Sequence, residues 1–172
     1  YTSPPYRGLA LMPYLMMELR KRHSKVELHV FSGMQLYDTD KPFKGPEAQE
    51  AKRVLATLSA IPGCTLHGNL TQAALAREFM RSAIMLYPNT VMETCCISAL
   101  EAQAGGCAVV TSALAALPQT VGDAGFVIKG QPGSPQYMQD MIAATDAILR
   151  DPQLWQQLSR NALSRIRKNY SW

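Results

Sequence analysis

The chain has 172 residues, which suffice for one ordinary domain with a substantial core but not for two full domains. Its composition, 47% hydrophobic and 17% charged, is typical of a globular protein, and no apolar run approaches the roughly 18 to 20 residues of a membrane span. The net charge of +4 is scattered, with its densest groups near expected helix ends, which disfavours a nucleic-acid partner. Because the chain opens at Tyr1 without a methionine, we expect it to be a fragment of something longer.

Short runs of branched or aromatic residues alternate with helical patterns along the chain. The first half predicts a helix over 9–22 that Pro13 kinks, a strand over 25–33 and a loop over 37–46, followed by a helix over 47–59 and a strand over 64–68. The second half predicts a helix capped by Thr71 and running to Met80, a strand over 83–88, a helix from 96 or 97 to 103, a strand over 107–112, a turn over 117–121, a strand over 124–130, and helices over 135–149 and 152–169. This alternation predicts an α/β fold: a doubly wound, Rossmann-like parallel sheet with helices on both faces.

The four cysteines, Cys64, Cys95, Cys96 and Cys107, lack metal-ligand spacing such as C-x-x-C. A disulfide between the neighbours Cys95 and Cys96 would strain the backbone. We therefore expect reduced thiols and a cytoplasmic protein.

The stretch "METCCISALEAQAGG", residues 92–106, follows a predicted strand end, where ligands bind in sheets of this kind. The amides of Cys95, Cys96 and Ile97 would lie unpaired at a helix start, which suits a phosphate. Glu101, about one turn inside the helix, could accept hydrogen bonds from a ribose diol, and Glu93 in the loop would reach the opposite side of the phosphate. Spacing alone leaves a chance arrangement open, because the helix dipole also favours a glutamate there.

Three segments resemble the retaining glycosyltransferases of family four, which share the GT-B fold and an E-x7-E motif followed by "EA-x-A-x-G-x-PVV". They are "YTSPPYRGL", "CTLHGNLTQAALAREFMRSAIMLYPNT" and "METCCISALEAQAGGCAVVTSALAALPQTVGDAGFVI". The resemblance implies that residues 1–172 are the C-terminal, donor-binding half of a GT-B glycosyltransferase whose N-terminal acceptor domain is absent from this chain.

The resemblance also implies roles for individual residues. Glu93 would contact hydroxyls of the donor sugar and Arg7 would neutralise the pyrophosphate, so these two are the candidate catalytic residues. Glu101 would bind the ribose, and Leu70 would lie near the base.

The donor-binding loop of the chain departs from the family pattern. Amides at Cys95, Cys96 and Ile97 would hold the distal phosphate, but Thr94, Cys95 and Cys96 stand where the family usually has Gly-Phe-Gly. Where many members have an arginine, this chain has Thr2. These differences leave open whether the loop keeps its usual amide geometry.

The implied reaction is hexosyl transfer with retention from a nucleotide diphosphate sugar to a glycan, lipid or protein acceptor. Because the sequence holds no D-x-D motif, we expect no metal ion and no cofactor, with Arg7 and the helix-start amides stabilising the departing diphosphate. Two alternatives remain, a non-catalytic nucleotide- or protein-binding module and a sugar-nucleotide 2-epimerase. A dehydrogenase is disfavoured because no G-x-G-x-x-G follows the first strand.

Overall fold

The structure, a computed structural model, describes residues 1–33 and 45–170. The elements of its first half are η1 (Leu9–Leu11), α1 (Met12–Arg22), β1 (Leu28–Val30), α2 (Pro46–Ser59), β2 (Cys64–Leu66) and α3 (Gln72–Arg81). Those of its second half are β3 (Ile84–Tyr87), α4 (Ile97–Ala104), β4 (Ala108–Ser112), α5 (Leu117–Val121), β5 (Gly125–Ile128), α6 (Pro135–Arg150) and α7 (Pro152–Asn169). The predicted α/β, Rossmann-like class is confirmed.

The strands form two parallel sheets, where the sequence pattern predicted a single one. β1 pairs with β2, while β4 lies between β3 and β5. The start of the chain lies between the two sheets: the Phe31 amide donates to the Tyr1 carbonyl (2.9 Å), and the Tyr1 ring lies 6.0 Å from that of Tyr87. No described strand pairs with both β1 and β3, and this segment contacts both sheets.

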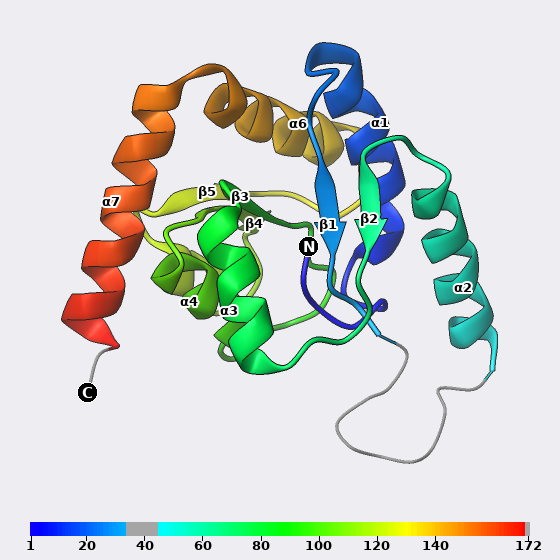
Figure 1. Cartoon of the computed structure of the whole chain (residues 1–172), viewed down its shortest axis with the longest axis horizontal. Helices are drawn as coiled ribbons and strands as arrows, with labels where there is room; N and C mark the ends of the chain where they lie inside the picture. The colour runs from blue at the N-terminus through cyan, green and yellow to red at the C-terminus, as the bar shows by residue number, and fades with distance from the viewer. Residues whose placement is uncertain (34–44, 171–172) are drawn as a thin grey trace.

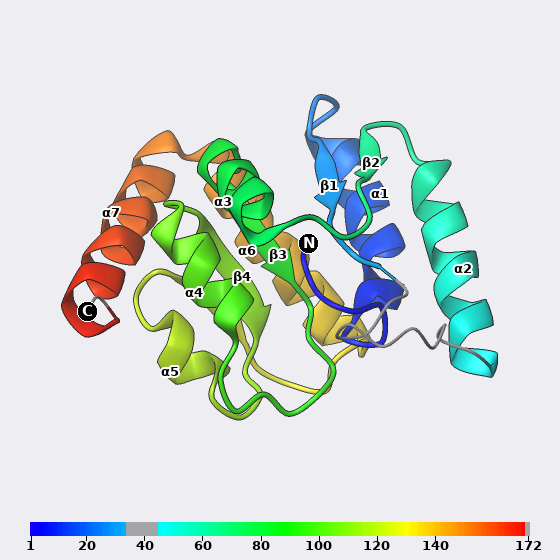
Figure 2. The same ribbon diagram turned by 60° about the horizontal axis from the view of Figure 1, so that its bottom comes forward.

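The β3–β5 sheet is the centre of the core. All five residues of β4 are buried, as its continuous apolar sequence predicts for a strand covered on both faces. Figures 1 and 2 show α4 and α6 on opposite sides of this sheet, and both helices contact β4. No helix within residues 1–33 and 45–170 is both long and apolar enough to cross a bilayer.

Helix α1 is fastened to α6 through the buried carboxylate of Asp146. His23 Nε2 lies 2.7 Å from its Oδ1, while Arg22 and Arg150 lie 3.3 and 3.0 Å from its Oδ2. The basic cluster at the end of α1 therefore partly serves an internal contact.

Three local predictions need correction. Pro13 produces no kink, because it lies in the first turn of α1, where the missing N–H and fixed φ are tolerated. The strand over 25–33 shortens to Leu28–Val30, and 117–121 is a short helix with its own proline in the first turn. The loop over 37–46 falls largely outside the described residues, and α2 already begins at Pro46.

Candidate functional site

Parallel strands end at one edge, so the loops that follow them gather there. The first two such loops to consider, residues 4–8 and 88–96, are in direct contact. Gly8, with a φ of +95°, approaches Pro88 so closely that a Cβ would lie 1.9 Å from the Pro88 carbonyl oxygen. The Thr90 hydroxyl also donates to the Tyr6 carbonyl (3.3 Å). This contact sets the position of Arg7 relative to the second loop.

Arg7 and Glu93, the two candidate catalytic residues, form an ion pair. Glu93 is only 5% exposed, and its Oε1 also accepts a hydrogen bond from the Tyr87 hydroxyl (3.0 Å). Its Oε2 has no partner among the described residues. Within residues 1–33 and 45–170, this buried carboxylate thus has one oxygen engaged and one without a partner.

The guanidinium of Arg7 keeps its charge in this setting. Burial alone would lower the pKa of Arg7, but hydrogen bonding to Tyr6 and Tyr87 and the charge of Glu93 raise it above its ordinary value. The side chain is 26% exposed, so it lies at the boundary between the buried carboxylate and solvent. A cation in that position can reach an anionic ligand while still touching Glu93.

Asn89, which sequence reasoning overlooked, shapes the loop that carries Glu93. It is fully buried; its Nδ2 donates to the Val91 carbonyl (2.5 Å), and its Oδ1 accepts from the Val91 amide (3.2 Å). The Ser112 hydroxyl donates to the Asn89 carbonyl (2.5 Å) and so ties the loop to the end of β4. The only sequence signal was an asparagine directly after a strand-ending proline, a combination typical of turns.

The start of α4 has free amides where the sequence predicted them. Its N-cap, Cys96, makes no side-chain capping bond, and the amides of residues 95–98 have no acceptor within the described ranges. These N–H groups, with the helix dipole behind them, form an anion-binding feature. Thr94 and Ile97 are exposed beside them.

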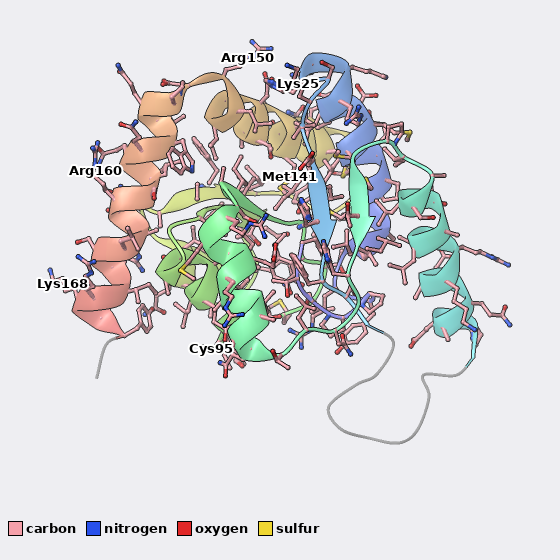
Figure 3. All side chains as sticks on the ribbon, in the orientation of Figure 1. Lys25, Cys95, Met141, Arg150, Arg160 and Lys168 are labelled. Carbon is pink, nitrogen blue, oxygen red and sulfur yellow. The ribbon has the colours of Figure 1, made fainter. Side chains whose placement is uncertain are left out.

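The adjacent cysteines differ in environment. Cys95 is exposed, and Figure 3 shows it at the surface on the side toward which β1 and β2 run. Cys96 is buried; burial, with a smaller contribution from the charge of Glu93, raises its pKa to about 11. Its thiol is therefore protonated at neutral pH, and only its backbone is offered to a ligand. All four cysteines are free, as expected.

Glu101 lies on the other side of the α4 start, one turn inside the helix. Its Oε1 accepts a hydrogen bond from Gln72 Nε2 (2.8 Å) in the first turn of α3, and Leu70, 36% exposed, precedes that turn by two residues. Thr71 caps α3, its hydroxyl accepting from the Ala74 amide (3.3 Å), as predicted. Gln72 thus links Glu101 to the loop that carries Leu70.

The structure brings the predicted residues together in two groups, whose glutamates lie before and after the start of α4 along the chain. Arg7 and Glu93 form one group, and Glu101 and Leu70 lie with Gln72 in the other. Within residues 1–33 and 45–170, no three His, Cys, Asp or Glu side chains are placed to hold a metal ion. The roles assigned to the individual residues, and the expectation of metal-free chemistry, remain predictions.

Comparisons with known proteins identify the family and the fold. The family described as "Glycosyl transferases group 1" matches residues 5–151. The chain is 25% identical, over 173 aligned positions, to the lipopolysaccharide 1,2-N-acetylglucosaminetransferase of Salmonella typhimurium, covering 98% of this chain and 42% of that protein. It therefore spans less than half the length of this curated relative.

Two solved structures share the fold. Sucrose-phosphate synthase from Thermosynechococcus elongatus superposes with a TM-score of 0.76 at 20% identity, over 96% of this chain and 39% of the other. The pneumococcal O-GlcNAc transferase GtfA, solved with UDP and GlcNAc, gives a TM-score of 0.69 at 16% identity, over 97% and 34%. The fold is thus that of the C-terminal domains of GT-B glycosyltransferases. The chain belongs to the group 1 glycosyltransferase family.

Proposed function

We propose that this chain is the donor-binding domain of a glycosyltransferase, and that it binds a nucleoside diphosphate sugar at the start of α4. The observation that carries the proposal is a helix start with free amides, which follows Glu93, the partner of the cation Arg7, and precedes the carboxylate of Glu101 by one turn. The amides and Arg7 match a pyrophosphate, and Glu101 matches a ribose diol. Leu70 lies in the loop just before Gln72 and would border the base.

Glu93 would face the sugar with its unengaged oxygen. As the sugar leaves, negative charge develops on the diphosphate, and the free amides and Arg7 are positioned to stabilise it. The amides are fixed by α4 and Arg7 carries a permanent charge, so no metal ion is needed in this scheme. Retention of anomeric configuration rests on the family resemblance alone.

The sugar nucleotide to test first is UDP-N-acetylglucosamine. The curated relative is named as an N-acetylglucosaminetransferase, and the pneumococcal enzyme was solved with UDP and GlcNAc. UDP-N-acetylglucosamine therefore serves as the probe for this class of donor.

The decisive experiment is calorimetric titration of the protein with UDP and UDP-N-acetylglucosamine. Arg7→Gln should weaken UDP binding by roughly 10-fold or more, since a charged hydrogen bond contributes about 1.5 to 3 kcal/mol. Arg160→Gln is the matched control: it removes the same charge from α7, where Arg160 points outward (Figure 3) and, within residues 1–33 and 45–170, hydrogen-bonds only to Gln157. No binding of either probe, or equal losses in the two variants, would refute the proposal.

For residues 1–172 alone we expect binding without transfer. GT-B enzymes react in a cleft between two domains, so an isolated donor domain leaves the phosphates on an open surface. Its Kd should lie at about 0.1 to 1 mM, or about 4 to 5.5 kcal/mol, and should rise with salt. Sugar transfer by this chain alone would contradict the two-domain mechanism.

The alternative of a binding module without catalysis has one specific observation in its favour. Thr94, Cys95 and Cys96 replace the usual glycine-containing loop, and the Cys96 side chain is buried beneath it. A full-length protein that binds UDP-N-acetylglucosamine but neither transfers nor hydrolyses the sugar would support this alternative.

A further inference from the structure

The hydroxyl of Tyr87 occupies a polar centre inside the core. Tyr87 ends β3 and is only 1% exposed. Its oxygen lies 3.0 Å from Glu93 Oε1, 3.2 Å from Asn89 Oδ1 and 3.3 Å from Ser3 Oγ. A phenylalanine would fill nearly the same volume without a polar group to desolvate, so packing alone does not account for the hydroxyl.

The single proton of this hydroxyl is best placed toward Glu93. The carboxylate is the nearest of the three acceptors and the only one with a formal charge, and charge-assisted hydrogen bonds are the stronger ones. Asn89 Oδ1 already accepts from the Val91 amide, and the Ser3 hydroxyl carries its own proton to donate to Tyr87. Burial raises the pKa of Tyr87 above its ordinary value, so the proton is retained.

Arg7 and Tyr87 therefore hold the same oxygen of Glu93 from two sides, but they differ in mobility. Arg7 is a long, partly exposed side chain that also faces the proposed pyrophosphate position, whereas Tyr87 is enclosed and fixed by β3. When a phosphate draws Arg7 away, Tyr87 is the remaining donor to Oε1. It then keeps Oε2 directed toward the ligand.

We propose that Tyr87 is a positioning residue that orients the Glu93 carboxylate toward the donor sugar, acting through Glu93 without touching the substrate. This inference rests on the proposed function, because it assumes that Glu93 faces the sugar. It predicts that the hydroxyl matters for the sugar part of the donor and not for the nucleotide part.

The test compares full-length wild type, Tyr87→Phe and Tyr137→Phe by calorimetry with UDP and with UDP-N-acetylglucosamine. Tyr137 is a matched control: it is also 1% exposed, and its hydroxyl lies 2.7 Å from Ser112 Oγ in the same core. Tyr87→Phe should leave the Kd for UDP within about threefold and weaken UDP-N-acetylglucosamine roughly 10-fold or more. Tyr137→Phe should change the Kd of neither ligand. Thermal melting reports whether each variant folds.

The possible outcomes separate this inference from the function beneath it. Tyr87 does not position Glu93 if Tyr87→Phe weakens the binding of both ligands equally or of neither. The same holds if wild type gains no affinity from the sugar. In each of these cases, UDP binding by wild type still supports a donor domain. If wild type binds neither probe, the inference fails together with the proposed function. A loss confined to the sugar nucleotide in Tyr87→Phe alone supports the inference.

Discussion

The contact between Gly8 and Pro88 gives the sharpest structural prediction, because it can be tested on stability and on binding. In Gly8→Ala the new Cβ would lie 1.9 Å from the Pro88 carbonyl oxygen, where real Cβ contacts stay above 3.0 Å. The obstacle is backbone, so it cannot rotate away, and the two loops must separate by about 1 Å. Gly8 also has a φ of +95°, which a residue with a side chain adopts only with strain.

The expected magnitude has two parts. The left-handed conformation costs about 1 to 2 kcal/mol, and overpacking costs about 1 to 3 kcal/mol more. The total of about 2 to 5 kcal/mol corresponds to a fall in Tm of roughly 4 to 20 °C for a chain of this size. Because Arg7 precedes Gly8, the same displacement separates Arg7 from Glu93 and should weaken UDP binding.

The matched control is Gly130→Ala. Gly130 has a similar φ of +102°, but no atom lies within 4 Å of the position that a Cβ would take there, so this variant carries the conformational strain without the clash. We expect it to lose about 1 to 2 kcal/mol and to bind UDP as wild type does. Calorimetric unfolding and UDP titration measure both effects. Equal melting of the two variants, with UDP affinity retained in Gly8→Ala, would refute the reasoning.

Three further predictions concern single side chains. Glu101→Gln should weaken UDP binding roughly 10-fold or more in a titration while melting near wild type, since the Glu101 carboxylate is partly exposed and, among the described residues, bonds only to Gln72. Unchanged affinity would remove Glu101 from the site. Cys95→Ser and Cys96→Ser should both keep UDP binding within a few fold because the amides remain. Only Cys96→Ser, which buries a hydroxyl, should have a lower Tm. Complete loss of binding in either variant would implicate a thiol. Asp146→Asn should destabilise the chain at neutral pH. Burial would raise the pKa of Asp146, but hydrogen bonding to His23 and the charges of two arginines lower it overall. The stabilisation by Asp146 is therefore full above the ordinary pKa of about 3.9 and disappears as pH falls through the lower folded-state pKa. Urea unfolding of wild type and Asp146→Asn across pH 3 to 7 should therefore show a difference that closes in acid, and a difference independent of pH would contradict the assignment.

Most of the local elements, and the free amides at the start of α4, could be predicted from the amino-acid sequence. Thr71 caps α3 because a short hydroxyl side chain reaches an amide three residues ahead, and β4 is buried on both faces because its residues are continuously apolar. Glu101 falls one turn inside its helix for the same local reason, the fixed rise and rotation of each helical residue. Such features depend on neighbours within a few positions, so they can be predicted from the order of residues along the chain.

Only the tertiary structure decided how Glu93 is held. Its ion pair with Arg7 joins residues 86 positions apart. Nothing in the sequence distinguishes Tyr87, whose hydroxyl bonds to the same Glu93 oxygen, from any other aromatic residue at a strand end. The division of the strands into two sheets likewise cannot be predicted from the sequence pattern, because alternation of strand and helix does not say which strands are neighbours. Contacts of this kind follow from how closely two loops can pack, as Gly8 packs on Pro88, and from which buried polar groups must then satisfy one another.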